Sequence, residues 1–67
     1  MKNVFLWCGN GYAFNEFYEP IIRELSGRCH VFLILEDSFL SQNTLEMVER
    51  LHHSDGVIEE YYVTHFH

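Results

Sequence analysis

Residues 2–35 read KNVFLWCGNGYAFNEFYEPIIRELSGRCHVFLIL and contain two apolar runs separated by a glycine turn and an amphipathic segment. The first run, residues 4–8, enters the turn at residues 9–11, and the second run, residues 31–35, follows the amphipathic segment 14–25. A strand, a glycine loop, a helix and a strand in this order are typical of a βαβ unit. The stretch therefore predicts two parallel strands joined by a helix.

The boundaries of these elements follow from local chemistry. Both apolar runs are continuous rather than alternating, which predicts strands over residues 3–8 and 29–35 that are buried on both faces. Pro20 lacks an N–H and is tolerated only in the first turn of a helix, so the regular helix is expected to start near Tyr18, after an irregular turn. Gly27 is expected to end it.

The remainder of the chain predicts one more helix and one more strand. The helix is expected to run from about Ser41 or Asn43 to His53. Its apolar residues are expected to face inward; they are Leu45, Met47, Val48 and Leu51. Residues 57–65 are rich in β-branched and aromatic side chains and predict a third strand, with glutamates at an exposed end. The expected fold class is α/β: an incomplete three-layer Rossmann-like βαβαβ unit with a three-stranded parallel sheet, forming a single half-domain over residues 1–67.

The order of the strands determines whether this unit can cover its own sheet. Parallel strands are joined by right-handed crossovers, so three strands laid down successively carry both helices on one face and leave the other face bare. The order 2-1-3 would instead place one helix on each face. With the successive order, the cover must come from the remainder of a larger chain or from a homo-oligomer. We expect an N-terminal piece of a larger protein, with a small self-associating module as the alternative.

The composition and net charge of the chain disfavour some classes of binding partner. Ten acidic residues against four basic ones give a net charge of −6, which argues against nucleic acid and anionic membranes as partners. No stretch approaches the ~20 apolar residues of a membrane span, and the first apolar run is too short for a secretory signal. The expected location is cytoplasmic.

The two cysteines are predicted to be free thiols. Cys8 is expected at the end of the first strand and Cys29 at the start of the second, about 15 Å apart at ~3.3 Å per residue. A disulfide needs Cα atoms within about 7 Å. Trp7-Cys8 is similar to the start of a thioredoxin motif, but the second cysteine of that motif would fall at Gly11. Cys8 is therefore expected to be a small buried side chain.

The histidines do not predict a metal site. Four of the five lie in the last third of the chain: His52, His53, His65 and His67. No cysteine or carboxylate accompanies them at the spacing of a metal motif, so they are expected to be surface residues or to contact a missing segment.

The glycine turn suggests, but does not complete, a dinucleotide fingerprint. In G-x-G-x-x-G the third glycine permits close packing of the helix against the strand, and here that position is Phe14. No cofactor is therefore expected. A nucleotide-cofactor unit that uses the glycine turn and Glu36 stays open as an alternative.

Residues 3–35 also resemble the opening of GT-B-fold glycosyltransferases and of the related UDP-N-acetylglucosamine 2-epimerases. The resemblance rests on the glycine loop after the first strand, on the helix string PIIREL at residues 20–25, and on Gly27-Arg28 before the next strand. It implies two Rossmann-like domains, of which the N-terminal one binds the sugar acceptor and the other binds the nucleotide-sugar donor. The loops that would face the acceptor contain Gly9, Asn10, Gly11, Tyr12, Glu36 and Asp37. No catalytic residue carries over, and this portion alone is expected to be inactive.

Overall fold

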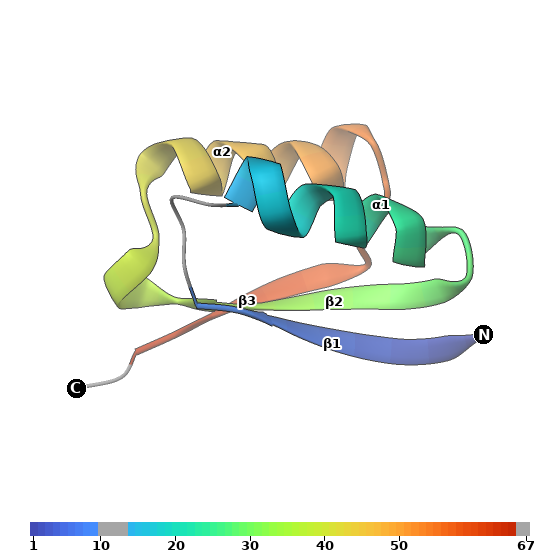
Figure 1. Cartoon of the computed structure of the whole chain (residues 1–67). Coiled ribbons are helices and arrows are strands. Elements are labelled where there is room, and N and C mark those ends of the chain that lie inside the picture. The colour runs from blue at the N-terminus through green and yellow to red at the C-terminus, as the bar shows by residue number, and fades with distance from the viewer. Residues whose placement is uncertain (10–13, 66–67) are drawn as a thin grey trace.

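The computed structural model describes residues 1–9 and 14–65 and shows a parallel sheet with a helical layer on one side (Figure 1). The strands are β1 (Lys2–Cys8), β2 (Cys29–Glu36) and β3 (Glu60–Thr64). The α-helices are α1 (Glu19–Ser26) and α2 (Gln42–Glu49). The described residues also form three shorter helical turns: the π-type η2 (Phe14–Tyr18) and η4 (Arg50–Ser54), and the 3₁₀ turn η3 (Asp37–Phe39).

The strand order is β1-β2-β3, and both pairings are parallel. This confirms the successive order, and Figure 1 shows α1 and α2 on the same face of the sheet, as that order requires. The described residues thus supply two of the three layers of a Rossmann-like unit: the sheet and one helical layer.

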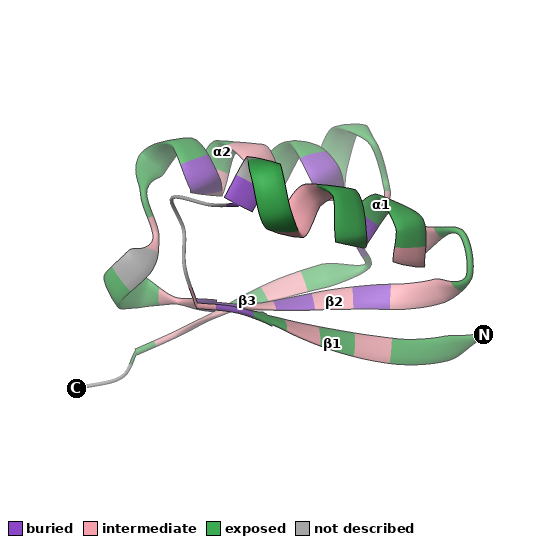
Figure 2. Cartoon of the chain, viewed as in Figure 1, coloured by how far each residue is buried: buried purple, intermediate pink, exposed green. Residues whose placement is uncertain are grey.

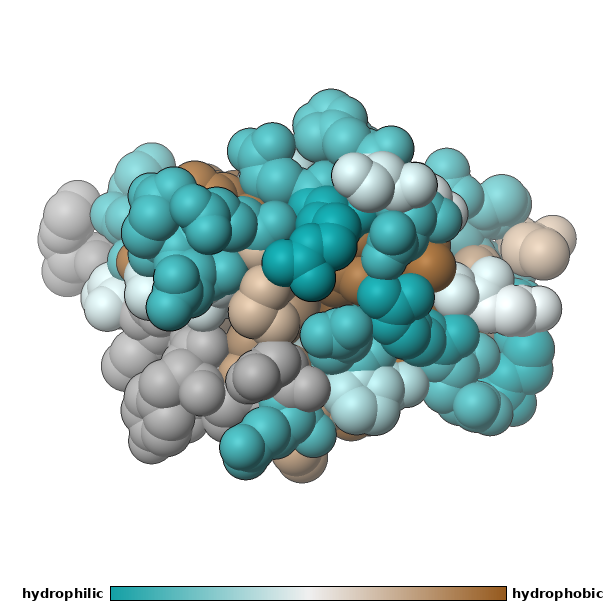
Figure 3. All heavy atoms as spheres, turned by 90° about the horizontal axis from the view of Figure 1, so that it is seen from above, coloured by the Kyte–Doolittle hydropathy of each residue, from teal (hydrophilic) through white to brown (hydrophobic). Residues whose placement is uncertain are grey.

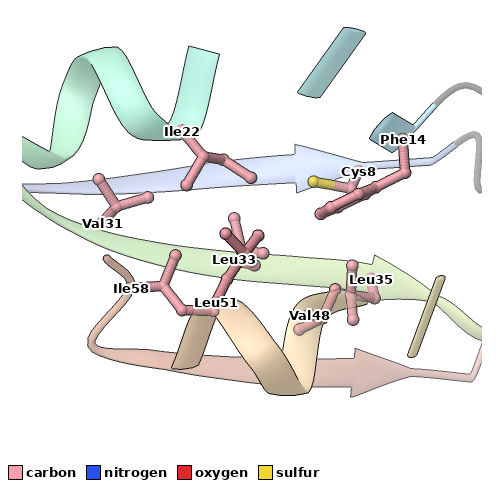
Figure 4. Close-up of a cluster of buried hydrophobic side chains, with 9 residues drawn as sticks. All are labelled: Cys8, Phe14, Ile22, Val31, Leu33, Leu35, Val48, Leu51 and Ile58. Atoms are coloured by element: carbon pink, nitrogen blue, oxygen red, sulfur yellow. The ribbon is translucent and has the colours of Figure 1, made fainter. Parts of the chain in front are cut away.

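The core lies between these two layers (Figure 4). Helix-facing side chains of β1 and β2 meet side chains from the helices and from the segment before β3. The buried cluster consists of Cys8, Phe14, Ile22, Val31, Leu33, Leu35, Val48, Leu51 and Ile58. Leu33 and Ile22 are fully buried, and Leu33 lies on the central strand.

The first helix begins as its proline predicts. α1 starts at Glu19 and has Pro20 in its first turn, where the missing N–H costs no helical hydrogen bond. A proline further inside a regular helix would press its ring against the carbonyl four residues earlier, which here belongs to Glu16. The preceding residues instead form the wider turn η2, which confirms the expected irregular start. Gly27 caps the other end, as expected.

The second helix begins at Gln42, beside its predicted start, and Ser41 is its cap. The Ser41 hydroxyl accepts a hydrogen bond from the Thr44 N–H at 3.1 Å, which satisfies one of the free donors of the first turn. Val48 and Leu51 are buried, as predicted, whereas Leu45 and Met47 are only half-buried. Thr44 also faces inward and is buried, because its hydroxyl is hydrogen-bonded to Ser41 Oγ at 2.9 Å.

The third strand is shorter than the predicted 57–65, and this expectation was wrong at its start. Gly56 has φ +65° and turns the chain, after which the Val57 N–H bonds to the carbonyl of Leu51. Ile58 then packs into the core rather than into the sheet. Strand pairing begins only at Glu60, opposite Phe32.

The face of the sheet that points away from the helices carries large apolar side chains. Alternate residues of a strand point to opposite faces, so this open face contains Phe5 and Trp7 of β1, Phe32 and Ile34 of β2, and Tyr62 of β3. Figure 2 shows the alternation of burial along β2 and the exposed positions of the outer strands. From above, the helical layer instead presents a mostly hydrophilic surface (Figure 3). None of the helices in the described part of the chain is long and apolar enough to cross a membrane.

Candidate functional site

Gly9, Glu36 and Asp37, the predicted site residues that the structure describes, lie at the carboxyl edge of the sheet. Parallel strands end on the same side, and the register aligns Cys8 with Leu35 and Glu36 with Thr64. The residues just beyond these ends are therefore neighbours in space. This is the edge at which ligands bind in open α/β sheets.

Gly9 and Glu36, which the sequence assigned to one site, do meet at this edge. A Cβ atom built on Gly9 would stand 3.0 Å from Glu36 Oε2 and 3.4 Å from Trp7 Nε1. The carboxylate and the indole N–H thus both approach the space above Gly9. Glycine is needed here for that space rather than for a positive φ, because Gly56 is the one glycine with positive φ among the described residues.

Asp37 has a partner that the sequence did not reveal. His65 Nδ1 lies 2.9 Å from Asp37 Oδ2, and both side chains are at least half exposed. β3 ends at Thr64 and its parallel pairing with β2 brings the next residue, His65, to the end of β2. A histidine oriented by a carboxylate is a common proton-accepting arrangement. The only signal in the sequence was that Asp37 comes shortly after the predicted second strand and that His65 ends the predicted third strand.

Asn10, Gly11 and Tyr12, the other predicted site residues, lie outside the residues that the structure describes. The candidate site consequently consists of Trp7, Gly9, Glu36 and Asp37 with His65. We call this group the carboxyl-edge site.

The basic residues of the chain lie away from the carboxyl edge of the sheet. Lys2 begins β1 and Arg28 precedes β2, so both lie at the amino edge. Arg23 reaches Asp55, in the segment leading to β3, at 2.8 Å, and Arg50 begins the turn that ends the second helix. All four basic residues of the chain therefore lie away from the carboxyl-edge site, which contributes carboxylates and no Lys or Arg.

Cys8 is next to the site but is not part of its chemistry. Its side chain is 4% exposed, and burial raises the pKa of its thiol to about 12. A thiol needs to ionise to act as a nucleophile, so Cys8 is a packing residue, as predicted. Cys8 and Cys29 are both free, which confirms the expected absence of a disulfide between them.

The other described histidines lie at the amino edge. His30 Nδ1 is 2.8 Å from Glu59 Oε1, and His52 Nε2 is 3.0 Å from the Glu59 carbonyl. Among the described residues, no group of three or more His, Cys, Asp and Glu side chains could hold a metal ion. These histidines serve contacts between β2, β3 and the end of the second helix.

Comparison with family models, with curated proteins and with solved structures finds no match for this chain. The carboxyl-edge site and the surfaces of the fold are therefore the features that indicate a function.

Proposed function

We propose that the carboxyl-edge site binds a hydroxyl-rich sugar acceptor, and that the chain is the acceptor side of a GT-B-like sugar transferase. The observation that carries the proposal is that Glu36 Oε2 and Trp7 Nε1 both lie beside Gly9, which has no side chain to cover them. A carboxylate only accepts hydrogen bonds and an indole N–H only donates them, whereas a sugar hydroxyl does both. A sugar hydroxyl beside Gly9 can therefore donate a hydrogen bond to the Glu36 carboxylate.

The charge of the site favours a neutral ligand over a nucleotide. Glu36 and Asp37 stand together, and the four basic residues lie toward the other end of the sheet. A diphosphate at this edge would meet carboxylates without a compensating Lys or Arg among the described residues. This argues against the nucleotide-cofactor alternative and agrees with donor binding by a different unit.

In this proposal, His65, oriented by Asp37, accepts the proton of the acceptor hydroxyl. The carboxylate orients the imidazole through the 2.9 Å contact at Nδ1. Such an imidazole can accept a proton from a hydroxyl group bound beside it. In a sugar transfer, the acceptor hydroxyl loses its proton as it attacks the donor, so a proton acceptor is needed on the acceptor side.

The test is a titration with neutral sugars. Trp7 is the single tryptophan, so its fluorescence reports on the site, and amide NMR shifts locate the binding. We expect N-acetylglucosamine, glucose or galactose to shift the signals of Gly9, Glu36 and Asp37 at millimolar concentration. Glu36→Gln should weaken binding about ten-fold or more, since hydrogen bonds to charged groups contribute ~1.5–3 kcal/mol.

Glu46→Gln is the matched control, because Glu46 is an exposed glutamate on α2 and lies outside the site. It should leave sugar binding unchanged. UDP, NAD and FMN are titrated in parallel. Binding of a nucleotide without any sugar response, or no response of the edge residues to any of these ligands, would overturn the proposal.

A further inference from the structure

The open face of the sheet is a second surface, which adjoins the carboxyl-edge site and shares Trp7 and Glu36 with it. Three of its four aromatic residues, Phe5, Trp7 and Tyr62, are 57%, 44% and 47% exposed. Phe5 stacks on Phe32 of the neighbouring strand with ring centroids 4.8 Å apart, and Ile34 lies between Trp7 and Tyr62 in the register. Contiguous apolar surface of this kind on a small protein marks an interaction site.

The charges around this face are acidic. Glu36 ends the central strand and Glu60 begins β3, and by strand alternation both positions belong to this face. The Glu60 carboxylate accepts the Tyr61 N–H at 3.1 Å and lies 3.7 Å from His52 Nε2, so it sits at the amino edge of the face. At the amino edge, His30 is bound to the carboxylate of Glu59. No Lys or Arg occupies a position of β1, β2 or β3 that points to this face.

The acidic charges and the limited area disfavour a second copy of the chain as the binding partner of this face. A second copy would bring its own Glu36 and Glu60 against the same carboxylates, and each copy has a net charge of −6. The area also disfavours a stable dimer. An aromatic side chain has an area of ~150–250 Å², so three half-exposed rings offer roughly 300 Å² on one face. Two such faces, even with Phe32 and Ile34 added, would bury less than the ~1,200 Å² that a stable specific complex needs.

The shape of the face fits an α-helix. Parallel sheets are normally covered by helices on both faces, and here α1 and α2 occupy the same one. Three strands ~4.8 Å apart make a surface ~10 Å across, which matches the ~10–12 Å diameter of a helix. The eight residues of β2 span roughly 26 Å at ~3.3 Å each, which a helix of about 17 residues covers at ~1.5 Å per residue.

We infer that the open face binds a basic amphipathic α-helix of a partner protein, with the apolar stripe of the helix on Phe5, Phe32 and Tyr62. Its Lys or Arg residues then approach Glu36 and Glu60. The modest area places the complex among weak, reversible interactions. This inference does not depend on sugar binding at the carboxyl-edge site.

The experiment titrates the isotope-labelled chain with a synthetic peptide of about 17 residues, the length estimated above. The peptide has Leu at helical i, i+3, i+4 and i+7 positions and Lys elsewhere. Two control peptides are a scrambled Leu–Lys sequence without an apolar stripe and a Leu–Glu peptide with the same stripe. We expect the Leu–Lys peptide to gain helicity on binding and to shift the signals of Phe32, Ile34 and Tyr62. The scrambled and Leu–Glu peptides should bind at least ten-fold more weakly.

Two pairs of variants locate the contact. Phe5→Ser should weaken binding of the Leu–Lys peptide several-fold, whereas Phe17→Ser should not, because Phe17 is similarly exposed, at 59%, but lies in η2 on the other layer. Glu36→Gln with Glu60→Gln should weaken binding by roughly two- to five-fold for each carboxylate, as surface ion pairs do, whereas Glu46→Gln should not. All five residues are exposed or half-exposed, so the variants are expected to fold, which circular dichroism verifies.

Three outcomes would overturn the inference. The first is equal binding of the Leu–Glu and Leu–Lys peptides, which would remove the charge argument. The second is shifts confined to α1 and α2, or no binding. The third is a tight dimer in sedimentation equilibrium that Phe5→Ser dissociates, which would identify a second copy as the occupant.

Discussion

The carboxylate of Glu36 lies beside the position that a side chain at Gly9 would occupy. The distance from a built Cβ to Glu36 Oε2 is 3.0 Å, shorter than real Cβ atoms normally allow. The register explains the closeness, because Cys8 pairs with Leu35 and the next residues of the two strands follow side by side. The absence of a side chain at position 9 is therefore what lets the end of β2 project its carboxylate toward β1.

Gly9→Ala tests this relationship. The contacted atom is the far end of a flexible side chain, so Glu36 should move away and the free energy of unfolding should fall by less than about 1 kcal/mol. In a Glu36→Ala background the same substitution should cost nothing. Urea denaturation of the four proteins of this cycle gives a coupling free energy that we expect to be ~0.5–1 kcal/mol. A coupling of zero would mean that the two residues do not meet.

Gly56→Ala and Gly27→Ala should have opposite effects on stability. Gly56 has φ +65°, where a Cβ costs ~1–2 kcal/mol, so its replacement should destabilise by about that amount. Gly27 has φ −76° and its nearest contact for a Cβ is the Glu24 carbonyl at 3.8 Å. Its replacement should stabilise by ~0.4–1 kcal/mol, because it restricts the unfolded chain. Thermal unfolding measures both, and a destabilised Gly27→Ala would contradict the cap geometry.

Leu33→Ala and Ile34→Ala compare the two faces of one strand. Leu33 is fully buried under the helices, so its truncation should cost ~2–5 kcal/mol. Ile34 points to the open face and is only half-buried, so its truncation should cost no more than about half as much. The midpoints of urea unfolding at unchanged m-value give the comparison. Equal losses would show that the open face is packed in solution.

Cys8 should make the stability fall at high pH. Burial raises the pKa of its thiol from the ordinary 9.0 to about 12. Between these values the unfolded chain loses the proton while the folded chain keeps it, so the free energy of unfolding decreases as the pH rises, by at most ~1.4 kcal/mol per pH unit. Below pH 9 both states are protonated and this contribution is constant. The Glu49 carboxylate raises the pKa of Tyr61 by accepting its hydroxyl hydrogen bond, which adds a slope of the same sign.

Cys8→Ala should remove much of this alkaline slope, and Cys29→Ala is the matched variant that keeps the Cys8 thiol. The same variants identify the thiols in a reaction with an aromatic disulfide. Half-buried Cys29 should react first, and Cys8, at 4% exposure, should react only as the chain opens. A Cys8 that reacts as fast as Cys29 in the folded state would contradict its burial.

Much of the secondary structure follows from short-range chemistry in the sequence. Pro20 restricts where α1 can begin, Ser41 provides a cap for α2, and the continuous apolar runs mark β1 and β2. The start of β3 could not be predicted in this way, because Ile58 has the β propensity of a strand residue. Its place in the core depends on the turn at Gly56 and on the helix above it.

The candidate site was predictable only in part. Parallel strands place the residues after each strand at one edge, so Glu36 and Asp37 could be expected beside Gly9. The pairing of Asp37 with His65 spans 28 positions of the chain. It depends on the register between β2 and β3, which the sequence does not specify because the predicted third strand began three residues too early.

The sequence by itself determined the elements, their parallel direction and the acidic balance of the chain, since these depend on local propensity, on crossover connections and on composition. Only the tertiary structure decided which apolar residues are buried. Phe32 and Leu33 are neighbours of similar hydrophobicity in a continuous apolar run, yet Leu33 is buried and Phe32 lies on the open face. The reason is the strand order: both crossovers carry their helices to one side, so the pleat of the strand assigns each residue to a covered face or to an open one.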